Sequence, residues 1–278
     1  MASLIREWVG INTFASATQT KLLELLGKLK QESVNTLTIL VMGKGGVGKS
    51  STVNSIIGER AVSVNPFQSE ATRPFMVSRA SAGFTLNIID TPGLIEGDFI
   101  NDRTLEILKR FLLNKTIDVL LYVDRLDAYR VDNLDRQVVK AITECFGKGI
   151  WNRALVVLTH AQFSPPDGFS YEDFCSKRSG ALLKVVRLGA GLEKHDKQVL
   201  PDGTAGIPHL VKTITDVVLN GSKSILVDKK LIEGSNPNER WKFFIPLIFA
   251  FQYFFVVKSM KRAIKNDIAK EGRASWYK

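Results

Sequence analysis

Apolar and polar positions alternate in blocks that predict strands and helices in turn. Short runs rich in Val, Ile and Leu are typical of strands that are buried on both faces. These runs lie at residues 37–41, 84–89, 119–123 and 154–158. Longer segments between and after them have apolar residues at helical spacing. They lie at residues 49–57, 101–113, 132–146, 170–188 and 207–219. This order predicts an α/β fold, with a mostly parallel sheet covered by helices on both faces.

The segment before the first strand predicts an amphipathic helix over residues 18–30, with leucines at helical spacing. Its leucines either pack on the domain or bind a partner, and both interpretations stay open. A turn-rich Ser-Asn-Pro-Asn sequence at 235–238 closes the α/β domain. We therefore expect an N-terminal helical region at 1–36, a nucleotide-binding domain at 37–234 and a linker at 235–242.

Residues 243–257 form an uncharged apolar run that contains seven aromatic residues. A helix of this length rises about 22 Å, which is shorter than the roughly 30 Å hydrocarbon core of a bilayer. Lys242 and Lys258 flank the run and can extend their charges to the membrane surface. We expect a single C-terminal transmembrane anchor, inserted after synthesis; a core helix or an interfacial helix is the alternative.

The charge distribution supports a membrane partner. The chain carries a formal net charge of +10, and half of that excess lies in the tail 258–278, where seven Lys or Arg face two acidic residues. A basic tail beside an apolar run favours a lipid bilayer over nucleic acid. Two cysteines without metal-ligand spacing fit a reducing compartment and exclude a disulfide framework.

A phosphate-binding motif follows the first predicted strand directly. Residues 43–50 read GKGGVGKS, which matches G-x-x-x-x-G-K-[ST] between a strand and a helix. Backbone N–H groups of such a loop surround phosphate oxygens, the lysine reaches the β- and γ-phosphates, and the serine hydroxyl ligates Mg²⁺. The nucleotide-binding residues expected here are Gly45, Gly46, Val47, Gly48, Lys49, Ser50 and Ser51.

A second motif, Asp90-Thr-Pro-Gly93, ends the next predicted strand. Asp90 would hold Mg²⁺ through water, and the Gly93 N–H would sense the γ-phosphate. With the first motif, this predicts a P-loop NTPase of the GTPase type. Leu94 stands where Ras-like enzymes carry the glutamine that orients the attacking water. Because leucine lacks a polar group, we expect slow hydrolysis unless a residue supplied in trans assists.

Two further segments contain candidate nucleotide contacts. Residues 65–72 lie where a first switch loop belongs, and the polar groups of Asn65, Gln68 and Ser69 could reach ribose, phosphate or Mg²⁺. A plain surface loop is equally compatible with this sequence. Arg125 and Arg130 follow the strand at 119–123, on the ligand side of an open α/β sheet. Each is a candidate arginine finger, with a solvated arginine as the alternative.

Several stretches together carry a family resemblance. They read GKGGVGKSS, NPFQSE, NIIDTPGLIEG, TIDVLLYVDRLDAYRVD and LTHAQFSPPDG, followed by the apolar tail. The chain resembles, over nearly its whole length, the small GTP-binding receptors of the translocon at the outer chloroplast envelope. The resemblance implies a septin-like GTPase domain that faces the cytosol, anchored in the chloroplast outer envelope membrane. It also implies recognition of precursor transit peptides, their transfer under GTP control to a β-barrel channel, a larger GTPase receptor as partner, and homodimers across the nucleotide face.

The resemblance also implies roles for single residues. GTP, GDP and Mg²⁺ are the expected cofactors, and Gln68 would lie near the metal. Arg130 would reach toward the nucleotide of the partner, and His160, in the sequence THAQ, would lie against the guanine ring. The expected catalytic residues are thus Lys49 and Arg130, and the expected metal ligands are Ser50, Gln68 and Asp90.

The chain departs from the family pattern before its last predicted helix. The family has one more strand there, with a Glu-Asn-Ser-Gly loop that completes the guanine pocket. Here residues 189–206 contain no β-branched apolar run, and the run at 185–188 is too short to replace the strand. Since a missing edge strand need not abolish the fold, we expect an exposed apolar edge at 154–158 and an intact phosphate site. Guanine selectivity should fall more than phosphate affinity.

Four functions remain open on the sequence. We favour a membrane-anchored GTPase receptor for chloroplast precursor import. A receptor-like module without a working nucleotide cycle is the first alternative, because the guanine pocket is incomplete. An adenine-nucleotide kinase or ATPase is disfavoured, since no feature indicates an adenine pocket or a second substrate site. A septin-like polymer would reveal itself by concentration-dependent assembly.

Overall fold

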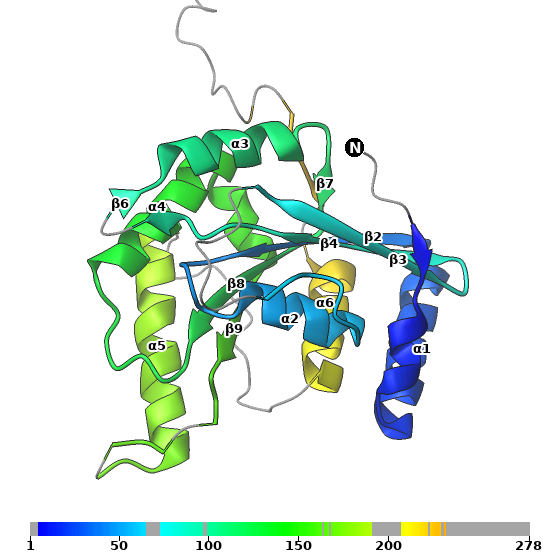
Figure 1. The fold of residues 1–278 in the computed structure, drawn as a ribbon, viewed down its shortest axis with the longest axis horizontal. Helices are drawn as coiled ribbons and strands as arrows, with labels where there is room; N and C mark the ends of the chain where they lie inside the picture. The colour runs from blue at the N-terminus through cyan, green and yellow to red at the C-terminus, as the bar shows by residue number, and fades with distance from the viewer. Residues whose placement is uncertain are drawn as a thin grey trace, which may run out of the picture. The chain divides into compact units, whose positions relative to one another are not determined.

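A six-stranded sheet forms the centre of the described chain in this computed structural model (Figure 1). The residues described are 5–64, 73–96, 99–162, 164–166, 168–190, 207–221, 223–228 and 231. The expected anchor at 243–257 lies outside them, as do the linker and the basic tail. Across the described residues, no helix combines the length and the apolar character needed to cross a membrane.

The strand order across the sheet is β1-β3-β4-β2-β8-β9. The bounds in that order are Arg6–Glu7, Phe75–Ser81, Phe84–Asp90, Thr36–Met42, Val119–Arg125 and Ala154–Thr159. Strands β4, β2, β8 and β9 run parallel to one another, whereas β3 runs antiparallel to β4. The prediction of a mostly parallel sheet is confirmed, and β3 is the long strand that the sequence pattern missed.

Within the described residues, six α-helices cover the two faces of this sheet (Figure 1). They are α1 (Ser16–Gln31), α2 (Lys49–Ile57), α3 (Asp102–Leu112), α4 (Asn133–Phe146), α5 (Tyr171–Ala190) and α6 (Ile207–Asn220). Ile39 and Val41 of β2 pack with α1, α2 and α6, while Leu40 and Met42 pack with α3, α4 and α5. The period-two alternation of a strand thus supplies two separate cores. All six helices confirm the sequence prediction, with ends that differ by a few residues.

Short elements complete the domain. They are the 3-10 helices η1 (Val9–Thr13) and η2 (Lys148–Arg153) and the strand pairs β5–β6 (Ile95–Glu96, Phe99–Ile100) and β7–β10 (Thr116–Ile117, Ile225–Leu226).

Two helix ends are explained by the residues that cap them. Gly58 ends α2 with φ of 76°, a left-handed conformation that glycine adopts without steric cost. Asp132 and Asp135 begin α4 with a reciprocal capping box.

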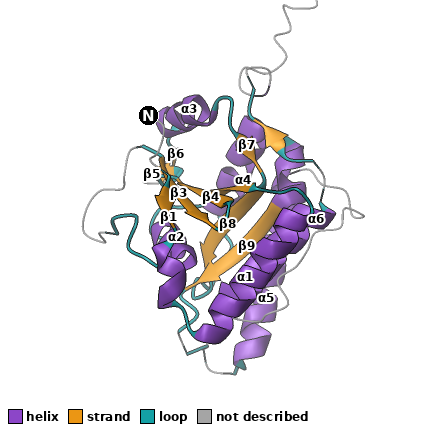
Figure 2. Cartoon of the chain, turned by 90° about the vertical axis from the view of Figure 1, so that its right-hand side faces the viewer, coloured by secondary structure: helices purple, strands orange, loops and turns teal. Residues whose placement is uncertain are grey.

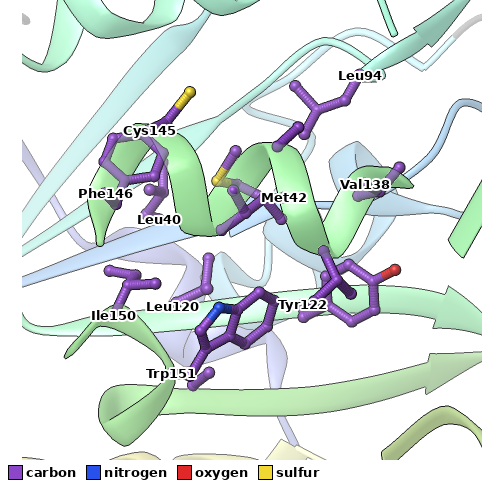
Figure 3. Close-up of a cluster of buried hydrophobic side chains, with 14 of the residues drawn as sticks. Leu40, Met42, Leu94, Leu120, Tyr122, Val138, Cys145, Phe146, Ile150 and Trp151 are labelled. Atoms are coloured by element: carbon purple, nitrogen blue, oxygen red, sulfur yellow. The ribbon is translucent and has the colours of Figure 1, made fainter. Parts of the chain in front are cut away.

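The core between the sheet and α4 is built around two buried aromatic residues (Figure 3). Tyr122 of β8 and Trp151 of η2 meet edge to face, with ring centroids 5.9 Å apart. The Trp151 Nε1–H donates to the Thr143 hydroxyl of α4 at 2.8 Å. Because η2 leads directly into β9, this contact fixes the start of β9 against α4.

The N-terminal region packs on the domain. Leu22, Leu26 and Leu29 of α1 are buried in the same core as α2 and α6, and α1 lies next to α6 (Figure 2). Of the two interpretations of this helix, packing on the domain is confirmed. The preceding segment holds the end of the P-loop helix, since the Trp8 Nε1–H donates to the Ile57 carbonyl at 2.7 Å.

We predict that Gly10→Ala destabilises the domain while Gly27→Ala does not. A Cβ on Gly10 would lie 2.1 Å from the Ile57 carbonyl oxygen, whereas one on Gly27, in α1, meets nothing within 4 Å. The first change should lower the free energy of unfolding by about 1–3 kcal/mol through overpacking. The second should raise it by up to ~1 kcal/mol through helix propensity. Chemical denaturation measures both, and equal effects of the two changes would contradict the packing described.

Candidate functional site

The loop between β2 and α2 forms a glycine-lined cradle at a helix N-terminus. Gly43, Gly46 and Gly48 have φ values of 154°, 66° and 91°, which residues other than glycine rarely adopt. A Cβ on Gly43 would also lie 2.2 Å from the Val123 carbonyl oxygen. Gly48 caps α2, so the N–H groups of the first helical turn and the positive end of the helix dipole lie at this loop. The arrangement suits a phosphate group.

The two motifs predicted to form the phosphate and metal site lie together. The Ser50 hydroxyl donates to Asp90 Oδ2 at 2.6 Å, and Asp90 is buried. The Thr91 hydroxyl holds the turn after β4 by donating to the Val41 carbonyl at 2.7 Å. Lys49 is also buried, and its Nζ donates to the Lys44 carbonyl. The loop, its lysine and the carboxylate are therefore placed by adjacent parallel strands.

This donor set fits Mg²⁺ bound together with phosphates. A hydroxyl and a carboxylate oxygen are the hard ligands that Mg²⁺ prefers, and the ion usually keeps water and substrate phosphates as its other ligands. Within the described part of the chain, no group of three His, Cys, Asp or Glu side chains could hold a metal by itself. Ser50 and Asp90 are the described residues that could contribute to such a site.

Leu94 is fully buried in the apolar core to which α4 contributes Val138 and Phe146 (Figure 3). Its backbone N–H contacts the Gly43 carbonyl at 3.5 Å, so the residue adjoins the P-loop through its main chain alone. The side chain packs among apolar neighbours.

The two arginine candidates differ in their surroundings. Arg125 makes a bidentate pair with Asp127, at 2.8 and 2.7 Å. This hydrogen bonding raises the pKa of Arg125 and lowers the pKa of Asp127. Arg130 is exposed, in the loop between β8 and α4. Of the two, Arg130 is the more exposed residue, whereas the Arg125 guanidinium is engaged by Asp127.

An apolar groove of about 690 Å³ runs beside β9, which is the edge of the sheet within the described residues. Gly48 and Ser51 lie at its P-loop end, and residues 155–161, α5 and α6 form its walls. His160 lines it with φ of 54°, and its Nδ1 lies 2.9 Å from the Thr159 hydroxyl oxygen. A volume of this size is typical of a small-molecule pocket, and its place beside the P-loop suits a base and ribose.

Some expected site residues lie outside the described chain. Asn65, Gln68 and Ser69 fall in the 65–72 gap of the described ranges, and their roles stay predictions. Conversely, sequence reasoning missed a buried charge cluster next to the P-loop, formed by Lys44, Asp124, Asp135 and Arg178. Burial raises the pKa of Asp124, while Lys44 and Arg178 act in the opposite direction. The one available signal was an acidic residue at the end of a predicted buried strand.

Comparison with known proteins identifies the family. The model of the AIG1 family matches residues 37–192. Translocase of chloroplast 34 from Pisum sativum is 67% identical, over 98% of this chain and 95% of the relative. This chain belongs to the Toc34/Toc33 family. Translocase of chloroplast 34 from Arabidopsis thaliana is 60% identical over 99% of the chain and 96% of the relative. The resemblance inferred from the sequence is thereby confirmed.

Solved structures of the family confirm the P-loop GTPase fold. Toc33 from Arabidopsis thaliana in complex with GDP and Mg²⁺ is 57% identical, with a TM-score of 0.74, over 80% of this chain and all of that one. The alignment with the Pisum sativum relative extends over 294 positions, 16 more than the 278 residues of this chain. Toc34 from that plant therefore has residues that lack a counterpart in this chain.

We predict that Leu94→Gln does not accelerate GTP hydrolysis and destabilises the domain. The position is fully buried, so the amide would lack the water and phosphate that it would need to orient. A buried polar group without partners costs about 1–3 kcal/mol of unfolding free energy. Leu94→Met, which keeps the volume, is the matched control and should cost less than ~1.5 kcal/mol. Single-turnover hydrolysis and thermal unfolding test this; faster hydrolysis in the glutamine variant would refute it.

Proposed function

We propose that this chain is a GTP-controlled receptor for chloroplast precursor proteins. Membership of the Toc34/Toc33 family supports a GTPase of the chloroplast protein-import machinery. The observation that carries the proposal is the Ser50–Asp90 contact beside a glycine cradle and a buried Lys49. Recognition of transit peptides and their transfer to a β-barrel channel follow from the family resemblance.

GTP, GDP and Mg²⁺ are the cofactors of this proposal. Toc33 from Arabidopsis thaliana has been solved with GDP and Mg²⁺ and with GMPPNP and Mg²⁺, at 57% and 56% identity to this chain. Lys49 and the P-loop N–H groups would hold the phosphates, and Ser50 and Asp90 the metal. Gln68 would join the metal site, and His160 would contact the base. Slow hydrolysis is expected because Leu94 is buried in the core.

Dimer formation is part of the same proposal. The R130A mutant of Toc33 from Arabidopsis thaliana is dimerization deficient, and dimerization is important for the GTPase activity of atToc33 and psToc159. This chain has arginine at position 130, with an exposed side chain. We therefore propose a homodimer, and a contact with a larger GTPase receptor, in which Arg130 reaches toward the nucleotide of the partner.

The membrane part of the proposal rests on sequence. Residues 243–257 would form a single C-terminal anchor in the chloroplast outer envelope, with the GTPase domain facing the cytosol. The basic tail 258–278 would lie beside the lipid headgroups.

A second candidate function is a receptor-like module that binds nucleotide phosphates without selecting guanine. Two observations favour it: the apolar groove beside β9 and the alignment that is longer than this chain. Phosphate affinity depends on the loop and on Lys49, whereas base selection depends on polar groups paired with the base edge. The two properties can therefore be lost separately.

Equilibrium binding of fluorescent GDP separates these functions. The full-length chain would be held in a mild detergent with Mg²⁺, and GTP and ATP would serve as competitors. Tight binding that GTP alone displaces supports the GTP-controlled receptor. Displacement by both nucleotides at similar concentrations supports the module without guanine selection. Lys49→Ala should abolish binding in both cases, because it removes the phosphate contact.

We predict that Arg130→Ala weakens the homodimer in the presence of GDP and Mg²⁺. The side chain is exposed and would lose its contact with the partner. Arg125→Ala is the matched control, since the Arg125 guanidinium is paired with Asp127. Sedimentation velocity over a concentration series gives the dimer dissociation constants. An Arg130→Ala value equal to that of the unmodified chain would contradict the role given to this residue.

A further inference from the structure

A cluster of four charged side chains, three of them buried, adjoins the loop that carries Arg130. Lys44 comes from the P-loop, Asp124 from the end of β8, Asp135 from the first turn of α4 and Arg178 from α5. The residues Asp124, Asp135 and Arg178 are only 1%, 0% and 4% exposed. Buried charges persist in proteins when they are paired, and two positive groups here balance two negative ones.

Arg178 fixes the beginning and the middle of the loop 126–132. Its Nη2 donates to Asp124 Oδ2 at 2.6 Å. Its Nη1 donates to the Arg130 carbonyl at 2.9 Å, and its Nε contacts the Arg125 carbonyl at 3.3 Å. A guanidinium is planar and rigid, so three acceptors on one guanidinium have defined positions relative to one another. The Arg130 main chain is thereby fixed while its side chain remains exposed.

Asp135 fixes the other end of the same loop. Its Oδ2 accepts from the Asp132 N–H at 2.9 Å, and Asp132 Oδ1 accepts from the Asp135 N–H at 3.1 Å. Within the loop, Tyr129 packs edge to face on Phe174 of α5, with centroids 5.9 Å apart. The loop is therefore held at both ends by the charge cluster and near its centre by an aromatic contact.

Lys44 connects this cluster to the phosphate site. Its Nζ lies 2.5 Å from Asp135 Oδ1 and 3.7 Å from Asp124 Oδ1. Its carbonyl accepts from Nζ of Lys49, the residue expected to reach the phosphates. One residue of the P-loop thus contacts the phosphate-binding lysine through its main chain and the Arg130 loop through its side chain.

We propose that Arg178 is a positioning residue that orients Arg130 for contact with a second copy of the chain. The Lys44–Asp135 pair extends this arrangement to the P-loop, so that nucleotide occupation and dimer contact are linked. Fixing the main chain at Arg130 lowers the entropy lost when its side chain contacts the partner. The inference rests on the proposed function, in which Arg130 makes that contact.

Arg178→Lys tests the positioning role. Lysine keeps a positive charge opposite Asp124 but lacks the planar fork that reaches the carbonyls of Arg125 and Arg130. With the full-length chain in detergent, GDP and Mg²⁺, we expect the homodimer dissociation constant to rise about tenfold, the scale of one lost charge-assisted hydrogen bond. The dissociation constant of fluorescent GDP should change by less than ~2-fold, since the phosphate cradle is intact. Arg187→Lys, at an exposed position on α5, is the matched control and should change neither.

A double-mutant cycle separates positioning from a general structural effect. If Arg178 acts through Arg130, adding Arg178→Lys to Arg130→Ala should weaken the dimer no further. Unchanged dimer affinity in Arg178→Lys, or full additivity in the double variant, would overturn the inference and leave the proposed function standing. If Arg130→Ala alone leaves the dimer unchanged, the proposed function fails, and the inference fails with it.

Asp135→Asn provides a second test, which also applies if Arg178→Lys does not fold. Asparagine keeps an oxygen that can accept from the Asp132 N–H but removes the charge opposite Lys44. We expect a weaker dimer, again without further effect in the Arg130→Ala background. The difference between the dimer dissociation constants with and without GDP should also narrow. Two results would overturn the link to the P-loop. One is that GDP changes the dimer dissociation constant of Asp135→Asn as much as that of the unmodified chain. The other is that GDP does not change the dimer dissociation constant of the unmodified chain.

Discussion

The parallel register of three strands is the constraint on which the site depends. Val41 of β2 pairs with Asp90 of β4, and Met42 pairs with Tyr122 of β8. Because parallel strands end at the same edge of a sheet, this register brings the P-loop, Asp90 and Asp124 together. The register is itself set by burial on both faces, since a shift by one residue would exchange the side chains of the two cores. Packing of the helices therefore determines where the nucleotide chemistry can occur.

The charge cluster beside the P-loop contributes more to the conformation of the Arg130 loop than to the stability of the domain. Removing water from four charged groups costs free energy that their mutual attraction only partly offsets, and apolar residues of similar volume are often as stable. The cluster also fixes the conformation of the Arg130 loop, because Asp135 and Arg178 each bind a main-chain group of that loop. A loop between a strand and a helix has few apolar contacts of its own. Buried ionic groups give it one conformation that an apolar core would not specify.

Local patterns were sufficient to predict the helices, the parallel strands and the contact between the P-loop and Asp90. They were insufficient for β3, because Ser78 and Arg79 interrupt its apolar character. Arg79 is nonetheless buried and paired with Glu59, a residue distant in sequence. The same limit applies to Arg178, since its acceptors lie about fifty positions earlier in the chain. Side chains whose partners come from other elements become visible only when the tertiary structure is known.

Helix α5 joins the groove beside β9 to the Arg130 loop. Cys175 and Ser179 line the groove, while Phe174 and Arg178 contact the loop. Each pair is spaced by four residues, so the two pairs form adjacent faces of one helix. The groove at the edge of the sheet therefore shares helix α5 with the loop proposed for dimer contact.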